Sequence, residues 1–177
     1  MNPTVKIEQA FLQLEFALKL TTYIELGKVD KASLDAALVV ELESGNIHFP
    51  GGAFHSYDDI ILAAQNNFFL TFGFTAVVLD HVLSEAGFAA DLPVSSPHRD
   101  LRALVYMIRC AFAHDMMHPR WKARGPFTRG LSVRLPSGPL LVDIKTLNLQ
   151  PLDVDQIGGM ARYLELRDEV KRIAVEA

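Results

Sequence analysis

The sequence predicts a mainly α fold, an up-and-down bundle of four main helices with two short β-hairpin insertions. Apolar residues recur at helical spacing over several long stretches, and Gly or Pro follows where these helices would end. Two shorter segments, about 39–49 and 131–147, instead alternate around turn residues, as hairpins do. With 177 residues, 50% hydrophobic and 21% charged, the chain is expected to form one helical domain over residues 1–177.

The first half of the chain contains two of the expected long helices. In residues 4–26 apolar side chains return every three or four positions, and Gly27 follows as a stop signal. A short helix is expected after Asp30, before the hairpin of residues 39–49 with its Ser-Gly-Asn turn. The second long helix is expected from residues 56–59, a capping-box-like start, to about Ala86. Its segment 68–83 is apolar nearly all round, which predicts the central, buried helix.

The second half contains the other two helices. Ser95-Ser96-Pro97 predicts a helix start with Pro97 at the first helical position, and this helix should run to about Met117, before Pro119. Residues 131–135 and 140–147 flank Pro-Ser-Gly-Pro and predict the second hairpin. The last helix is expected over residues 154–174. One side of it is expected to carry Met160, Leu164, Arg167 and Val170.

Composition limits the class of protein. The single cysteine excludes an intramolecular disulfide and a cysteine-cluster zinc site, which suits a reducing cytoplasm. The N-terminus turns amphipathic at once and lacks a signal-peptide core. The most apolar run, 68–79, contains Thr and Gly and ends at Asp80, so it is interpreted as a core helix and not as a membrane span. A cytoplasmic protein without membrane association is therefore expected.

A candidate site lies near the end of the third long helix, in the stretch Arg109-Cys-Ala-Phe-Ala-His114. A guanidinium binds phosphate oxygens through a planar fork of donors that keeps its charge. An imidazole titrates near neutral pH and can move the proton of a ribose 2′-hydroxyl. Arg109 and His114 are therefore candidate catalytic residues for cleaving RNA without a metal.

This stretch resembles the signature of the HEPN superfamily, helical-bundle proteins whose motif is Arg, four to six residues, then His toward the end of a core helix. The match covers roughly residues 97–121. The resemblance implies a HEPN-like bundle, a homodimer with a composite site, and a metal-independent endoribonuclease that leaves 2′,3′-cyclic phosphate ends. It also implies a toxin or defence effector held silent by a partner, such as an antitoxin or a nucleotidyltransferase-type protein. No cofactor or metal is expected.

The spacing of the two motif residues favours such a composite site. Five residues at about 100° each place His114 about 140° around the helix from Arg109, so one helix converges them poorly on one phosphate. Two copies related by a two-fold axis could bring them together. Apolar residues of the motif helix are expected in part at that interface: Met107, Phe112, Met116 and Met117. The alternative is that Arg109 pairs with Asp80 or Asp115 and that His114 caps the helix C-terminus.

Three neighbours of the motif are expected to support it, namely Tyr106, Cys110 and Asp115. Active HEPN proteins usually have a polar residue directly after the Arg, where this chain has Cys110. A thiol is a poor donor for positioning a phosphate, which favours the alternative of a non-catalytic HEPN-like module that binds RNA or nucleotide or dimerises.

Charge is segregated along the sequence. Residues 116–142 contain five basic and no acidic residues, so this segment carries +5 while the whole chain carries −4 and the remainder −9. Phosphate contacts and base stacking are expected from Arg120, Trp121, Lys122 and Arg124. The alternative is a solvated loop that balances an acidic body. The overall acidity disfavours a strong, nonspecific nucleic-acid binder.

A third alternative is a metal hydrolase. His114 and His118 stand four residues apart, the spacing of helical zinc sites, but a further ligand would have to come from a distant His or carboxylate. Pro119 also places His118 at a fraying helix end. No metal is therefore predicted at the site.

Overall fold

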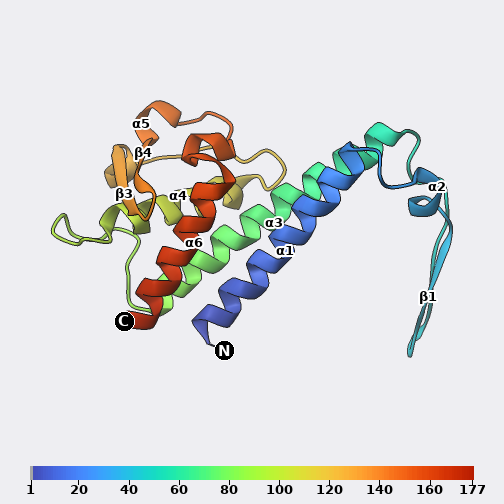
Figure 1. Ribbon diagram of the computed structural model, residues 1–177, viewed down its shortest axis with the longest axis horizontal. Helices are drawn as coiled ribbons and strands as arrows, with labels where there is room; N and C mark the ends of the chain where they lie inside the picture. Colours follow the sequence, from blue (N-terminus) through green and yellow to red (C-terminus); the bar gives the residue numbers. More distant parts are fainter. Residues whose placement is uncertain (1) are drawn as a thin grey trace. The chain divides into compact units, whose positions relative to one another are not determined.

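The computed structural model describes residues 2–177 and is mainly helical, with two small antiparallel hairpins in that range (Figure 1). The predicted fold class is confirmed at this level. The helices are α1 (Pro3–Glu25), α2 (Lys31–Leu34), α3 (Tyr57–Glu85), α4 (Arg99–His114), α5 (Ile144–Leu147) and α6 (Gly159–Glu176), with short 3-10 helices at Gly125–Phe127 and Val154–Ile157. The strands are β1 (Leu38–Leu42), β2 (Gly45–Phe49), β3 (Gly130–Leu135) and β4 (Gly138–Asp143).

The chain packs as two compact units. The larger unit contains the chain up to Gln13 and Phe69–Ala177, and the smaller unit contains Leu14–Phe68. Both α1 and α3 contribute residues to each unit. The expectation of one domain over residues 1–177 stays a prediction.

An aromatic cluster forms the centre of the larger unit. The ring of Tyr163 on α6 lies 4.5 Å from that of Phe72 and 5.5 Å from that of Phe11, measured between centroids. The Tyr163 hydroxyl shares a 2.9 Å hydrogen bond with the hydroxyl of Thr75, which satisfies both buried polar groups. Burial raises the pKa of Tyr163 far above its ordinary value. These contacts fix α1, α3 and α6 around one core.

Gly73 lets α4 approach α3 closely. A Cβ atom at this position would lie 2.6 Å from Cδ1 of Phe112, which is buried against Phe72. Only a residue without a side chain fits that contact. Gly73 therefore sets how α4, the helix of the candidate site, packs on α3.

The prediction that α3 is the central, buried helix is wrong for one of its faces. Phe72 and Leu79 are buried, whereas Phe74 is 49% exposed and Val77 is similarly open, because the packed elements cover only part of the circumference. At 29 residues α3 is also long and apolar enough to cross a membrane, which the apolar run 68–79 did not indicate. One such helix is weak evidence for a span, since core helices of soluble proteins pass the same test.

The second hairpin supports α4. β3 pairs with β4 in antiparallel register, Leu131 opposite Val142 and Val133 opposite Leu140, and every second β3 side chain is buried. β3 contacts both α4 and α6. The hairpin was expected to reach residue 147, which is wrong, because Asp143 accepts a hydrogen bond from the Lys145 N–H and starts the short helix α5.

The predicted start of the last helix also needs correction. α6 begins only at Gly159, after a 3-10 helix and a left-handed Gly158. Of the residues expected along one side of α6, Val170 is buried and Met160 and Arg167 are half-buried, whereas Leu164 is exposed. The buried residues of α6 are Tyr163, Leu166, Val170 and Ile173.

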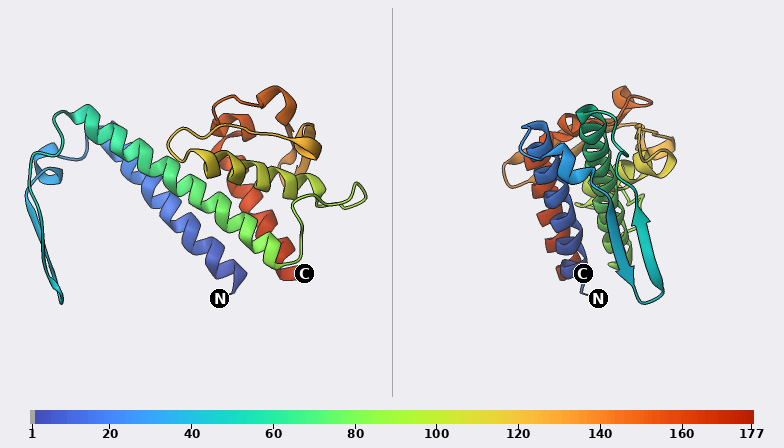
Figure 2. Two further views of the ribbon diagram at one scale, coloured as in Figure 1. Left: turned by 180° about the vertical axis from the view of Figure 1, so that it is seen from behind. Right: turned by 90° about the vertical axis from the view of Figure 1, so that its right-hand side faces the viewer.

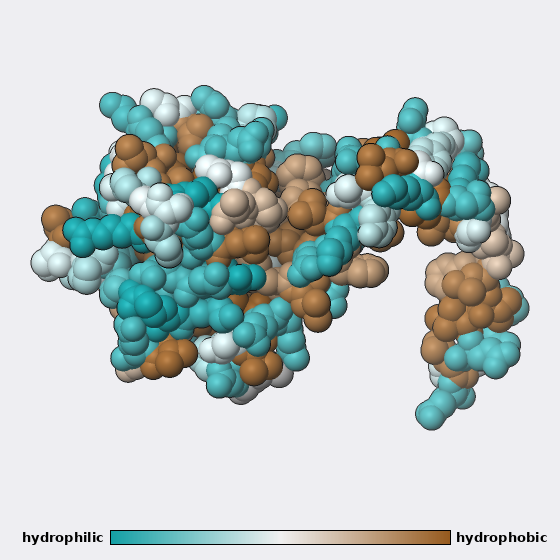
Figure 3. Space-filling model, viewed as in Figure 1, coloured by the Kyte–Doolittle hydropathy of each residue, from teal (hydrophilic) through white to brown (hydrophobic). Residues whose placement is uncertain are grey.

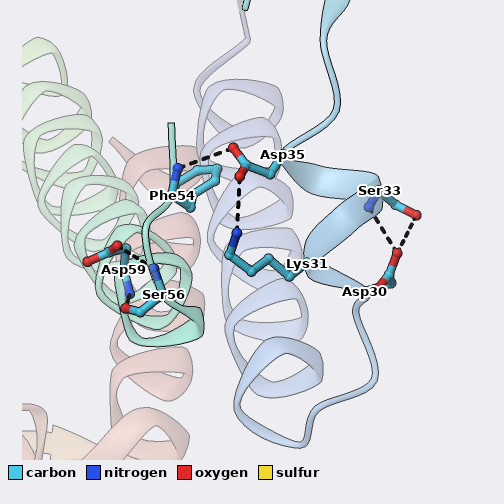
Figure 4. A network of polar contacts seen from close by, with 7 residues as sticks. All are labelled: Asp30, Lys31, Ser33, Asp35, Phe54, Ser56 and Asp59. Atoms are coloured by element: carbon cyan, nitrogen blue, oxygen red, sulfur yellow. Dashed lines mark hydrogen bonds and ion pairs between the residues drawn. The ribbon is translucent and has the colours of Figure 1, made fainter. Parts of the chain in front are cut away.

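The start of α3 agrees with the capping-box prediction. The Ser56 N–H donates to Asp59 Oδ2 at 2.8 Å, and the Asp59 N–H donates to Ser56 Oγ at 3.3 Å (Figure 4). Two orphan donors at the helix end are thereby satisfied. Backbone N–H donation from Ser56 lowers the pKa of Asp59.

The base of the first hairpin is held by one carboxylate in the smaller unit. Asp35 accepts from the Phe54 N–H at 3.2 Å and from Lys31 Nζ at 3.1 Å (Figure 4). Beyond this base β1 and β2 run antiparallel, with Leu38 opposite Phe49 (Figure 2). Their exposed apolar side chains form the hydrophobic surface over the hairpin in Figure 3. The predicted hairpin at about 39–49 is confirmed.

Candidate functional site

The motif helix ends three residues earlier than predicted. His114 is the last residue of α4, and Asp115 is extended, with φ −154° and ψ 109°. Its Oδ1 accepts the N–H groups of Met117 and His118, both at 2.9 Å. These bonds close a turn over residues 115–118 in place of another helical turn, and they lower the pKa of the exposed Asp115 carboxyl. The helical spacing of His114 and His118 assumed for a zinc site is therefore wrong.

Arg109 makes a loose ion pair with Asp80. Its side chain is 41% exposed, and Nε lies 3.9 Å from Asp80 Oδ2. The same carboxylate makes a much closer contact, 2.7 Å, with Arg102. The pairing with Asp80 considered for Arg109 thus exists, but it is loose and leaves most of the guanidinium donors accessible.

Arg102, which sequence reasoning did not single out, is the buried arginine of α4. Its side chain is 3% exposed and has three acceptors. One nitrogen donates to Asp80 Oδ1, Nε donates to the Phe88 carbonyl at 3.0 Å, and the other donates to Ser84 Oγ at 3.1 Å. All these partners are intramolecular, so this arginine is structural.

His114 opens into a pocket of about 250 Å³. The pocket is lined by Tyr106, Met107, Cys110, His114, Lys122, Arg124 and Phe127. Cys110 and His114 share this face of α4, as their spacing predicts, and Tyr106 packs on Phe127 with ring centroids 4.9 Å apart. A hydrogen bond with Cys110 raises the pKa of the Tyr106 hydroxyl. Tyr106 and Cys110, which were expected to support the motif, thus line the same pocket as His114.

His114 also lines a second pocket, of about 200 Å³. It is lined by Ala111, His114, Asp115, His118, Arg120, Trp121, Lys122 and Leu149. His114 and Lys122 line both pockets, whereas Arg109 lines neither. The turn at Asp115 brings His118 into this pocket, with its Nδ1 3.6 Å from Asp115 Oδ2. Within one protomer the structure therefore groups His114 with Lys122 and His118, and not with Arg109.

The basic segment 116–142 divides into paired and unpaired charges. Arg129 donates to Asp100 Oδ1 at 2.6 Å, and Arg120 donates to the Leu149 carbonyl at 3.3 Å. For the side chains of Lys122 and Arg124, the structure of residues 2–177 shows neither a hydrogen bond nor an ion pair. These two side chains line the pocket of His114. Two of the five positive charges of this segment, those of Lys122 and Arg124, thus lie at the pocket of His114.

Trp121 requires a correction. Its side chain is fully buried, and its Nε1 donates to Gln156 Oε1 at 2.6 Å. The Trp121 N–H donates to the Gln150 carbonyl, and its own carbonyl accepts from Leu149, so the segment is extended and side chains alternate. Trp121 therefore points inward between the outward Arg120 and Lys122, and the predicted base stacking on Trp121 is wrong.

The interface predicted from the motif helix also changes. Met107 and Phe112 are buried inside the larger unit and cannot lie at a dimer interface. Met116 and Met117 follow the helix end and remain about half exposed. Only these two of the four apolar residues stay available for the predicted two-fold contact.

The donor groups near the site do not form a metal cluster. Among residues 2–177 no group of three or more His, Cys, Asp or Glu side chains is placed to hold a metal ion. His114 and His118 therefore have no third protein ligand in the described part of the chain. The chemistry these side chains do offer is proton transfer by two imidazoles beside two unpaired cations.

Comparison with known proteins gives no match. No family model fits this chain, and no similar protein was found among curated proteins or solved structures. The HEPN resemblance therefore stays a prediction.

Proposed function

We propose that the protein is a HEPN-like, metal-independent RNA endonuclease in which His114 transfers the proton of the ribose 2′-hydroxyl. The observation that carries this proposal is the pocket of His114, where Lys122 and Arg124 have no partner within the described chain. An imidazole gives acid–base chemistry near neutral pH, and two unpaired cations attract a phosphodiester. The products would be a 2′,3′-cyclic phosphate and a 5′-hydroxyl.

Arg109 would act from a second copy of the chain. It lies on another face of α4, outside both pockets of His114, and most of its donors are accessible. Across a two-fold axis at the helix ends, its planar fork could stabilise the charge of the pentavalent transition state. The exposed Met116 and Met117 lie next to His114 in sequence and suit such a contact.

The biological setting follows from the HEPN resemblance. We propose a cytoplasmic toxin or defence effector whose nuclease site is covered by a cognate antitoxin or a nucleotidyltransferase-type partner. The exposed position of His114 agrees with control by a partner, because an uncovered nuclease would cleave cellular RNA. Co-purification of the chain expressed with its genomic neighbours tests this point.

The second candidate is a non-catalytic HEPN-like module that binds RNA or nucleotide. One observation favours it: Cys110, which occupies the position after the motif Arg, lines the pocket of His114. A thiol is a poor donor for positioning a phosphate. The same pocket would in this case bind RNA without cleaving it.

The deciding experiment incubates the purified protein with a mixed RNA pool in chelator. We expect cleavage of RNA but not of DNA, since the reaction needs the 2′-hydroxyl. His114→Ala should lower the rate on the order of 10²–10⁴-fold, the usual contribution of general acid–base catalysis. His48→Ala, which changes an exposed histidine of β2, serves as the matched control and should retain full activity.

Two outcomes would count against the nuclease. Activity that disappears in chelator would support the metal hydrolase built on His114 and His118. RNA binding that depends on Lys122 and Arg124, without any cleavage, would leave the non-catalytic module.

A further inference from the structure

His118 has a position that the Arg–His motif does not explain. It lines the second pocket together with His114 and Lys122, all from one protomer. Asp115 Oδ1 accepts the His118 N–H, and Oδ2 lies 3.6 Å from Nδ1 of the His118 ring, which is 82% exposed. Cleavage of RNA by transesterification needs one group to accept a proton and another to donate one. A composite dimer site would take the second group from another copy, but here a second imidazole is already present.

We propose that His118 is the second proton-transfer residue, so that one protomer carries both the general base and the general acid. This inference rests on the proposed nuclease function and assigns the catalytic groups of that same site. Lys122 holds the scissile phosphate, because it and His114 are the residues shared by both pockets. A phosphate at this shared position borders both pockets.

The two pockets then accept the two nucleosides that the phosphate joins. Their volumes, about 250 Å³ and about 200 Å³, are smaller than those of typical drug-sized ligand sites and suit one nucleoside each. The first has Arg124 and the half-buried rings of Tyr106 and Phe127, which offer a base an aromatic surface. The second has Arg120 and His118. The substrate class is therefore single-stranded RNA read as a dinucleotide step.

The two roles are assigned by position. Oδ2 of Asp115 lies 3.6 Å from Nδ1 of His118, which leaves Nε2 of that ring for the substrate. In this assignment His118 donates the proton and His114 accepts one.

In the reaction, His114 removes the proton of the 2′-hydroxyl and the 2′-oxygen bonds to phosphorus. The bond from phosphorus to the 5′-oxygen breaks, and that oxygen takes the proton of His118. The products are the 2′,3′-cyclic phosphate and the 5′-hydroxyl, and water restores the two histidines to their starting protonation states. No other reactant is needed.

The experiment compares two dinucleotide substrates in chelator, one with the ordinary 5′-oxygen and one with a bridging 5′-sulfur. On the oxygen substrate, His118→Ala should lower the single-turnover rate on the order of 10²–10⁴-fold, as loss of a general acid does. A thiolate leaves without being protonated. On the sulfur substrate the loss should therefore fall to about tenfold or less, whereas His114→Ala should stay severely impaired on both.

The outcomes distinguish the role of His118 from the proposed nuclease function. If His118→Ala cleaves the oxygen substrate as fast as the wild-type protein while His114→Ala does not, the nuclease stands and the role of His118 is refuted. A defect of His118→Ala that the sulfur substrate does not rescue would mean that His118 is structural, which also overturns the inference. If the wild-type protein cleaves neither substrate, the proposed function fails and the assignment of His118 fails with it.

Discussion

Arg102 and Arg109 lie two turns apart on α4 and both contact Asp80, yet they differ in burial and in the number of their partners. Arg102 is buried and donates to Asp80, Ser84 and the Phe88 carbonyl, whereas Arg109 is 41% exposed and only reaches the outer side of Asp80. Beyond the end of the helix, Lys122 and Arg124 have no partner within the described residues. A buried charge needs its partners for the protein to fold, while an unpaired surface charge contributes little to stability and remains free for a ligand. The part of α4 around Arg102 thus serves the fold, and under the proposed function the end at His114 serves binding.

The largest expected effect comes from breaking the buried network. Arg102→Met leaves the Asp80 carboxylate without its close partner, and removal of one member of a buried ion pair costs about 3–5 kcal/mol. Arg109→Met removes an exposed, loose pair and should change the free energy of unfolding by about 0.5 kcal/mol or less. Urea unfolding of both variants measures the difference. Equal losses of stability would mean that the two arginines do not have separate roles.

The next effect concerns the packing of α4 on α3. Gly73→Ala places a methyl group against the Phe112 ring, and overpacking of this kind costs about 1–3 kcal/mol. Gly130→Ala is the matched control, since a Cβ there meets nothing within 4 Å. Thermal unfolding compares the two. A Gly73→Ala variant as stable as the control would show that α4 shifts at little cost, and the geometry at His114 would then be less fixed than described.

The smallest expected effect is local and depends on pH. Backbone N–H groups of His118 and Met117 lower the pKa of Asp115 below its ordinary value of 3.8. A carboxyl with a lowered pKa in the folded state stabilises its turn above the ordinary value and loses this contribution as pH falls through the lowered one. The turn over residues 115–118 should therefore loosen below about pH 4 without global unfolding. NMR signals of the Met117 and His118 amides follow this, and in Asp115→Ala the transition should be absent. Global unfolding over the same interval would contradict a local role for Asp115.

Local sequence patterns predicted much of the architecture. The helical spacing of residues 4–26 and the reciprocal signals of Ser56 and Asp59 act over a few residues, and α1 and the start of α3 follow them. The turn residues also act over a few positions, and they predicted both hairpins. The face shared by Cys110 and His114 was predictable too, because it follows from helix geometry alone.

Features that depend on contacts distant in sequence were missed. Trp121 turns inward because its backbone pairs with residues 149–150 and its indole reaches Gln156. Arg102 is buried because its acceptors lie on α3 and at Phe88. The residues near Arg102 on α4 do not predict these contacts. The end of α4 at His114 had one usable signal, the Asp115 side chain three residues before His118, which favours a turn over a further helical turn.

The measurement that tests the central claim most directly is the salt dependence of RNA binding. If Lys122 and Arg124 are unpaired because they bind phosphate, the double variant Lys122→Gln, Arg124→Gln should bind single-stranded RNA more weakly. Its slope of log affinity against log salt should fall by about 1.4, roughly 0.7 for each lost phosphate contact. Arg134→Gln, which removes an exposed charge of β3 outside both pockets, should leave the slope unchanged. An unaltered slope in the double variant, with a lowered melting temperature, would show that these cations support the fold and would contradict the account.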